Sequence, residues 1–142
     1  MTITIDLNVV LDVVQKRQPH YAASAAVLSL VVERRMTGLL PAHALTTIHY
    51  IVDRFAGRKK AGEFVDWLLL HFEVAPAGKT ELIRARELEF SDFEDAVVAA
   101  CAIQAESDLI ITRNIADFAG SPVPAVTPEE FLAGEWGFLE KR

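Results

Sequence analysis

Two spacings of apolar residues alternate along this chain. Short continuous runs of apolar and β-branched residues predict buried strands, whereas longer segments with apolar residues at about every third or fourth position predict helices. The predicted strands lie at residues 2–6, 39–40, 73–75 and 109–112, with a weak edge strand at 123–126. The predicted helices lie at residues 8–15, 19–36, 41–55, 59–71, 80–88 and 91–106, with a last short one from residue 127.

This alternation of strands and helices favours parallel pairing, because each helix returns the chain to the same end of the sheet. We therefore expect an α/β protein, a three-layer α/β/α sandwich with a central, mostly parallel sheet. A length of 142 residues is too short for two domains. We expect one domain at residues 1–133 and a C-terminal tail at residues 134–142, in which apolar side chains stand among charges.

Several of the predicted helices begin at recognisable capping signals. Asn8 is a candidate N-cap of the first helix. Ser91 and Glu94 have the spacing of a capping box ahead of a long apolar segment, and Thr127 and Glu130 repeat that spacing. These signals predict where the long helix after residue 91 and the last short helix begin.

Composition limits where the protein acts. Hydrophobic residues make up 51% of the chain and the mean hydropathy is +0.24, which fits a compact, well-buried protein. No apolar run approaches the roughly 18 residues of a membrane helix, and the N-terminus lacks the basic and apolar segments of a signal peptide. Cys101 is the only cysteine, so no internal disulfide forms. We expect a cytoplasmic protein without a membrane contact.

The net charge of −6 argues against a protein that coats nucleic acid without specificity. It leaves room for an enzyme that cuts nucleic acid, because acids concentrated at a metal site are offset by the bound cation. A local basic strip could then hold phosphates, and the candidates are Arg54, Arg58, Lys59 and Lys60. A solvated corner between two helices explains the same four residues equally well.

Acidic side chains gather where strands end and helices begin. Asp6 closes the first strand, Asp92 and Asp95 open the long helix, and Asn114 and Asp117 follow the fourth strand. In a parallel sheet these positions meet at the carboxyl edge, where ligands bind. Converging carboxylates repel one another unless a cation joins them, and a set of oxygen ligands suits Mg²⁺ or Mn²⁺ better than zinc.

Each of these residues also has a purely structural explanation. Asp92 and Asp95 could favour the positive end of their helix, an effect of roughly 0.3–1 kcal/mol each. Asn114 could be a turn residue, and Asp117 could cap a one-turn helix. Asp6 is the hardest to explain structurally, although it could cap the helix that follows it.

The motifs around these residues, taken in order, resemble the PIN domain family, and in particular its VapC-type bacterial and archaeal members. The matching segments are Ile5-Asp6-x-Asn8-Val9, Asp95-Ala96-x-x-x-Ala99, Leu109-Ile110-Ile111-Thr112-Arg113-Asn114-x-x-Asp117-Phe118 and Val126-Thr127-Pro128-Glu129-Glu130-Phe131-Leu132. The resemblance implies an endoribonuclease that depends on Mg²⁺ or Mn²⁺ and cleaves single-stranded or structured RNA with a metal-activated water. It also implies a homodimer and a small antitoxin partner.

The resemblance also implies a role for individual residues. Asp6 would be the first acid, Asp95 the third, and Asp117 with Asn114 the fourth-acid region, so that Asp6, Asp95 and Asp117 hold the metal. Thr112 would order a ligand or a metal-bound water. Accessory candidates are Asn8, Asp92 and Arg113.

One position departs from the family pattern. The family's second acid is a glutamate in the helix after the second strand, and His49 falls where it would stand. No aspartate or glutamate occurs from residue 36 to residue 52. His49 could ligate a softer metal, contact substrate, or serve only the structure.

Two further functions stay open at this point. A PIN-like domain weakened by the missing acid could bind RNA or a protein without cutting. A phosphatase of another α/β class could use an acidic site on small phosphate monoesters.

Overall fold

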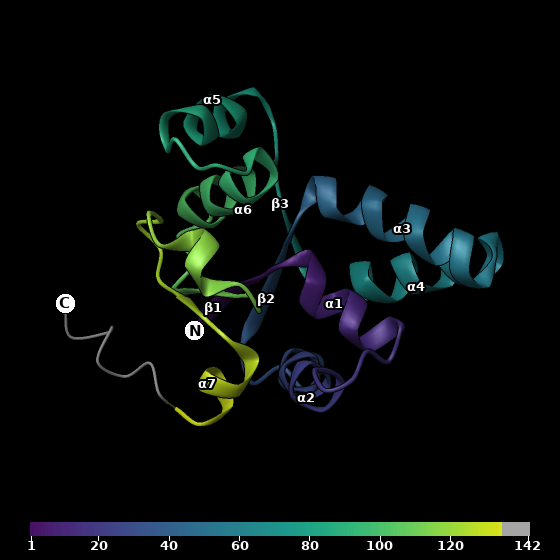
Figure 1. The fold of residues 1–142 in the computed structure, drawn as a ribbon. Helices are drawn as coiled ribbons and strands as arrows, with labels where there is room; N and C mark the ends of the chain where they lie inside the picture. The colour runs from purple at the N-terminus through teal and green to yellow at the C-terminus, as the bar shows by residue number, and fades with distance from the viewer. Residues whose placement is uncertain (135–142) are drawn as a thin grey trace.

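Five parallel strands form the centre of the molecule, with helices on both faces (Figure 1). The structure is a computed structural model that describes residues 1–134. The strands are β1 (Thr2–Ile5), β2 (Thr37–Pro41), β3 (Glu73–Ala75), β4 (Leu109–Ile111) and β5 (Ala125–Val126). Their order is β3-β2-β1-β4-β5, and every neighbouring pair is parallel. The predicted α/β/α sandwich is confirmed.

The helices pack in neighbouring pairs around this sheet. They are α1 (Leu7–Val14), α2 (Tyr21–Val32), α3 (Ala42–Ala56), α4 (Arg58–His71), α5 (Lys79–Glu87), α6 (Phe93–Gln104), the 3₁₀ helix η1 (Ile115–Phe118) and α7 (Pro128–Leu132). In Figure 1, α5 and α6 lie on one side of the sheet, α1 and α2 lie on the other, and α3 and α4 run side by side as a hairpin. None of the helices among residues 1–134 has the length and apolar character needed to cross a membrane.

Alternate side chains of the strands divide the core between the two faces. Ile3 and Ile5 of β1 belong to the cluster that packs under α1, α2 and α3. Ile110 of β4 points to the other face, where it joins Val98 and Ala99 of α6. The same alternation directs the polar side chains of the strands. The residue just beyond each strand lies at the carboxyl edge of the sheet.

The carboxyl ends of β1 and β4 lie side by side at the point where the order of the strands reverses. The chain first builds β1, β2 and β3 outward, and then returns to lay β4 against the free side of β1. The register pairs Ile5 with Ile111. Because ligands of open α/β sheets bind at such a reversal, Asp6 and Thr112 stand where a site is expected.

The long helix α6 is buried along most of its length because its side chains are small. Seven consecutive residues are buried, at positions 96–102, and four of them are alanine. Alanine lets the helix approach the sheet and α5 closely without leaving voids. Cys101 fits this role, since it is a free, buried thiol whose Sγ lies 3.4 Å from the carbonyl oxygen of Pro76. The first turn of α6 is thereby held over the carboxyl edge of the sheet.

Two predicted helix starts need correction. The N-cap of α1 is Asp6, whose carboxylate accepts the amide of Leu7 at 2.8 Å, whereas Asn8 lies inside the helix. The N-cap of α6 is Asp92, whose carboxylate accepts the amide of Asp95 at 3.0 Å, so the capping box predicted at residues 91 and 94 is wrong. Aspartate caps as well as asparagine or serine does, and each displaced cap lies within two residues of the actual one.

The capping box predicted for the last helix is confirmed. Thr127 accepts the amide of Glu130 at 3.0 Å, and Glu130 accepts the amide of Thr127 at 2.9 Å. Pro128 occupies the first turn of α7, where its missing amide hydrogen has no role in the helix. The predicted tail, apart from Gly134, lies outside the described residues.

Three helices, α1, α2 and α6, end in a Schellman motif whose left-handed residue is not glycine. Arg34 has a φ of 60°, and its amide and that of Arg35 bond to the carbonyls of Val31 and Leu30 in a Schellman pattern. The same pattern ends α1 at Lys16 (φ 51°) and α6 at Glu106 (φ 55°). The second helix therefore stops at Val32, and β2 begins at residue 37 instead of 39.

Candidate functional site

Asp6 is the deepest residue of the site. It follows β1, and its side chain is 4% exposed. One carboxylate oxygen, Oδ2, accepts the hydroxyl of Thr112 at 2.8 Å, while Oδ1 accepts the amide of Leu7. Burial raises the pKa of the Asp6 carboxyl to about 6, and the Thr112 hydrogen bond opposes that rise. The sheet therefore holds a carboxylate in one orientation at a site that disfavours its charge.

Two carboxylates from the first turn of α6 join it. One oxygen from each of Asp6, Glu94 and Asp95 lies within 4.8 Å of the other two. Asp95 is half-buried, and burial raises its pKa to about 7, with the negative charges of Asp6 and then Asp92 as further causes. Three acids have thus converged, and the negative charge of Glu94 raises the pKa of both Asp6 and Asp95.

This donor set fits a divalent metal ion. Carboxylate oxygens are the ligands that Mg²⁺ and Mn²⁺ prefer, and a cation between the three groups would remove the repulsion that raises the pKa of Asp95. No thiolate belongs to this cluster, because Cys101 bonds elsewhere in the core. Within residues 1–134, Asp6, Glu94 and Asp95 form the only group of three or more acidic, histidine or cysteine residues close enough to share an ion.

The segment after β4 borders this cluster. The amide of Asn114 donates to the Thr112 hydroxyl at 3.2 Å, which ties the start of the segment to the residue that bonds Asp6. The side chains of Asn114 and Asp117 are exposed, and Asp117 lies in η1. Asp117 stands outside the tight group of three, yet its charge helps to raise the pKa of Asp95. It is therefore at the rim of the site.

Arg113 is fixed by a buried partner on another element. Its Nε lies 3.1 Å from Oδ2 of Asp12, whose side chain is fully buried in α1. The hydroxyl of Ser24 in α2 donates to the same oxygen at 3.1 Å. The Arg113 side chain is one quarter exposed, and its charge lowers the pKa of Asp6. A fixed positive charge thus borders the acids.

Two residues of this site, Glu94 and His43, were not predicted from the sequence as site residues. The Nε2 atom of His43, in the first turn of α3, lies 3.1 Å from Oε1 of Glu94. The sequence predicts Glu94 as the capping-box partner of Ser91, but the N-cap of α6 is Asp92, and its carboxylate accepts the amide of Asp95. The signal that could have found it is the run of three acids at positions 92, 94 and 95, which is one more than a helix start needs.

His49 stands on a different side of α3 from His43. Six residues separate them, which in a helix is a rotation of about 240° and a rise of about 9 Å. His49 is half-buried and does not belong to the group of acids described above. The histidine that contacts an acid of the cluster is His43. The predicted role of His49 at the second-acid position stays a prediction.

Two accessory candidates, Asp92 and Asn8, lie outside the group of three acids. Asp92 caps α6, and its charge adds to the rise of the pKa of Asp95. Asn8 is half-buried in α1, and its Oδ1 is buried without a hydrogen-bond partner.

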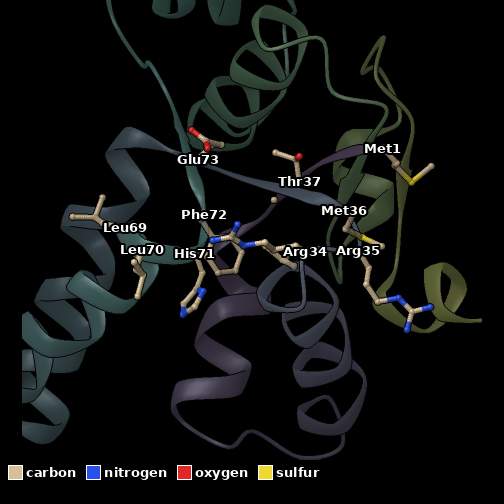
Figure 2. A pocket seen from close by; sticks show the side chains of 12 residues that line it. Met1, Arg34, Arg35, Met36, Thr37, Leu69, Leu70, His71, Phe72 and Glu73 are labelled. Carbon is tan, nitrogen blue, oxygen red and sulfur yellow. The ribbon is translucent and has the colours of Figure 1, made fainter.

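A separate cavity of about 600 Å³ opens at the opposite, amino end of the sheet. Figure 2 shows Leu69 and Leu70 of α4 on one side of it and Met1 and Met36 on the other. It holds Glu73 as its one acidic residue, so it has no set of carboxylates for a metal. Because ligands of parallel sheets bind at the carboxyl ends of strands, the acidic cluster is the better candidate for chemistry.

Comparison with known proteins identifies related sequences over most of the chain. A family model described as PIN domain matches residues 2–116. Ribonuclease VapC1 of Aquifex aeolicus (strain VF5) is 26% identical over 140 residues, which cover 95% of each chain.

Solved structures with the same fold are more distant in sequence. VapBC2 from Rickettsia felis, bound to a DNA fragment from its promoter, superposes with a TM-score of 0.70 at 18% identity, covering 89% of this chain and 98% of that one. FitAcB from Neisseria gonorrhoeae gives a TM-score of 0.69 at 20% identity, with the same coverage. VapC20 of Mycobacterium tuberculosis, a toxin that cleaves the sarcin-ricin loop, gives 0.61 at 13% identity, covering 76% and 86%.

Proposed function

Because the chain belongs to the PIN domain family, we propose that it is an endoribonuclease that hydrolyses phosphodiester bonds of single-stranded or structured RNA. The family match supports a nuclease, and the name of the Aquifex aeolicus relative supports RNA as the substrate. The observation that carries the proposal is the convergence of Asp6, Glu94 and Asp95 within 4.8 Å at the carboxyl edge of the sheet.

The cofactor we propose is Mg²⁺ or Mn²⁺, held by Asp6 and Asp95 with Asp117 at the rim. A bound divalent ion would supply a water of lowered pKa and would neutralise charge on the phosphodiester. The raised pKa values of Asp6 and Asp95, at about 6 and about 7, support a site whose carboxylates are ionised fully only beside a cation.

The protein's own contribution is to fix these groups in advance. Thr112 and the amide of Leu7 occupy one oxygen each of Asp6, so that its carboxylate does not rotate. Arg113, held by Asp12, is suited to attract a phosphate to the rim, and the exposed side chain of Asn114 is suited to contact the RNA. Preorganised charges of this kind act without reorganisation during the reaction.

The proposed partner is a small antitoxin protein, and we also propose a homodimer. Several solved relatives are toxin–antitoxin complexes, among them one from Klebsiella pneumoniae. Two mostly apolar hollows of about 390 and 420 Å³ lie along α1, α2, α3 and α4, and Trp67 lines both of them. They would suit an apolar helix of the partner. Light scattering of the protein alone, and then with the product of a small neighbouring reading frame, tests both assemblies.

The test of the activity is cleavage of single-stranded and hairpin RNA by purified protein. We expect cleavage with Mg²⁺ or Mn²⁺, none with EDTA, and a loss in the Asp6→Asn variant, which keeps the capping oxygen but removes the charge. Absence of cleavage by the wild type with either ion would contradict the proposal.

A second candidate function is a domain that binds RNA or protein without cutting. It is favoured by the lack of any acid in the first three turns of α3. Such a protein would retain RNA in a filter-binding assay, give no heat with Mn²⁺ in calorimetry, and leave the RNA intact.

A further inference from the structure

We propose that Glu94 supplies the third carboxylate of the metal site, in place of the acid that α3 lacks, and that His43 is the positioning residue that holds it there. This inference rests on the proposed function, because it concerns the metal site of that nuclease. The acid expected from α3 would then come from α6, where Glu94 directly precedes Asp95.

The placement of Glu94 is the first observation that supports this role. Adjacent residues of a helix point about 100° apart, so Glu94 and Asp95 do not face one spot by default. The side chain of Glu94 nevertheless brings an oxygen within 4.8 Å of Asp6 and Asp95. With 44% of that side chain exposed, rotation toward solvent was open to it.

The electrostatics of this position are unfavourable without a cation. One oxygen of Glu94 lies within 4.8 Å of an oxygen of Asp6 and of Asp95, so the negative charges of the three groups repel one another. The helix dipole favours a glutamate at a helix start in either orientation. A glutamate with only a structural role would therefore point away from two other acids, because that lowers the repulsion between the charges. Its convergence on them is the arrangement expected of a ligand, in which stability is given up for binding.

His43 explains how Glu94 stays in place. It lies in the first turn of α3, two residues after the end of β2, and so at the same edge of the sheet as Asp6. Its Nε2 lies 3.1 Å from Oε1 of Glu94, while its Nδ1 is buried without a partner. In the tautomer with the proton on Nε2, Nε2 donates to Glu94 and the buried Nδ1 carries no hydrogen. This tautomer is consistent with both observations. Helix α3, which lacks the acid, thus supplies His43, and His43 orients Glu94 as the replacement.

Calorimetric titration of metal-free protein with Mn²⁺ alone tests the ligand role. We expect Glu94→Gln to weaken Mn²⁺ binding at least tenfold. The matched control is Glu129→Gln, which removes the same charge from the second position of another helix, α7, and should bind Mn²⁺ as the wild type does.

The positioning role has its own variants. His43→Ala should weaken Mn²⁺ binding by about 10–100-fold, as is typical when an outer hydrogen-bond partner of a ligand is removed. His43→Gln should restore most of the affinity, because its amide keeps a donor near the position of Nε2. Equal binding by His43→Ala and the wild type would overturn this part of the inference.

Thermal unfolding separates a ligand from a structural ion pair. If Glu94 is a ligand, Glu94→Gln in EDTA should unfold at the same or a higher temperature than the wild type, because one repelling charge is gone. Added Mn²⁺ should then raise its melting temperature less than it raises that of the wild type. A melting temperature that falls in EDTA, together with unchanged Mn²⁺ affinity, would show that the contact with His43 is structural and would overturn the inference.

Mn²⁺ binding and RNA cleavage by the wild type distinguish failure of this inference from failure of the proposed function. Mn²⁺-dependent RNA cleavage by the wild type, with undiminished Mn²⁺ affinity in Glu94→Gln, overturns the role of Glu94 and leaves the nuclease intact. No Mn²⁺ heat and no cleavage in the wild type overturns both.

Discussion

Asp6 carries several roles at the scale of single residues. It caps α1, accepts the Thr112 hydroxyl and contributes an oxygen to the acidic cluster. The capping role alone would leave it near the surface, where a cap is usually solvated. Burial at 4% exposure instead raises its pKa to about 6, which indicates a group placed for chemistry.

The Thr112 hydroxyl should matter for activity more than for folding. Thr112→Val keeps the shape of the side chain but removes the hydrogen bond that lowers the pKa of Asp6. We expect RNA cleavage to fall by about 10–100-fold, with the pH at half-maximal rate moved upward. Thr112→Ser, which retains a hydroxyl, is the control and should stay near the wild-type rate. A pH–rate profile that is the same for valine and threonine would contradict this role.

The raised pKa values predict an unusual pH dependence of stability. Asp6 and Asp95 bind protons more tightly in the folded state, at about 6 and about 7, than at their ordinary value of 3.8. The folded protein therefore holds more protons between these values, and stability falls as the pH rises from about 4 to about 7.

Thermal unfolding in EDTA checks this pH dependence. The two groups should lower the melting temperature of the metal-free wild type between pH 5 and pH 7.5, and Asp6→Asn should flatten that change. Saturating Mn²⁺ should also flatten it, because the cation replaces the protons. A wild type and an Asp6→Asn variant with parallel curves in EDTA would contradict the predicted shift at Asp6.

Among secondary-structure elements, helix ends were harder to predict from sequence than helix bodies. The sequence pattern located α1 to α6, because burial of a face follows directly from apolar periodicity, whereas α7 was located by its capping box and η1 was not predicted. The end of the second helix was predicted four residues too late, at residue 36 instead of Val32, since Arg34 takes the left-handed conformation usually given to glycine. The cap of α6 was misplaced because serine and aspartate, which cap almost equally well, stand next to each other at positions 91 and 92.

Replacing Glu106, the residue in the left-handed conformation after α6, by glycine should stabilise the fold. Glu106→Gly at a φ of 55° removes the strain of a Cβ atom in that region, partly offset by the greater freedom of glycine when unfolded. We expect a gain of up to about 1 kcal/mol in the free energy of unfolding, measured in urea. Glu106→Ala, which keeps the Cβ atom, should show no gain. Equal stabilisation by both changes would point to the lost charge instead.

The contact between Asp12 and Arg113 links α1 to the segment after β4. Asp12→Ala removes the partner of the guanidinium and of the Ser24 hydroxyl. We expect a loss of about 1–3 kcal/mol in the free energy of unfolding, because Arg113 is only one quarter exposed. Asp12→Asn, which still accepts from Ser24, should lose less. Chemical denaturation of both variants measures the difference, and equal losses would assign the effect to charge alone.

For the whole molecule, the fold and most of the site could be predicted from the sequence. The order of strands and helices fixes which edge of the sheet collects Asp6, Thr112 and Asp95, since parallel strands share one carboxyl end. The run of acids at positions 92, 94 and 95 marks Glu94 as a candidate, but its contact with His43, 51 residues away in the chain, could not be predicted. Such a contact exists only once the first turns of α3 and α6 come together.

The distribution of charge over the molecule bears on how RNA is held. The net charge is −6, yet Arg54, Arg58, Lys59 and Lys60 are all exposed at the corner between α3 and α4. If this strip holds phosphates, replacing Arg58, Lys59 and Lys60 by alanine should reduce the slope of log affinity against log salt by up to about 2. Filter binding of RNA to a cleavage-deficient Asp6→Asn background measures it. An unchanged slope would mean that the strip is a solvated corner.

The most direct test of the central claim is anomalous diffraction from a crystal soaked in Mn²⁺. We predict one strong peak at the carboxyl edge of the sheet, in direct contact with Asp6 and Asp95, with Glu94 completing the set and His43 behind it. A crystal that takes up Mn²⁺ elsewhere, or not at all, and shows no peak among these carboxylates would contradict the account.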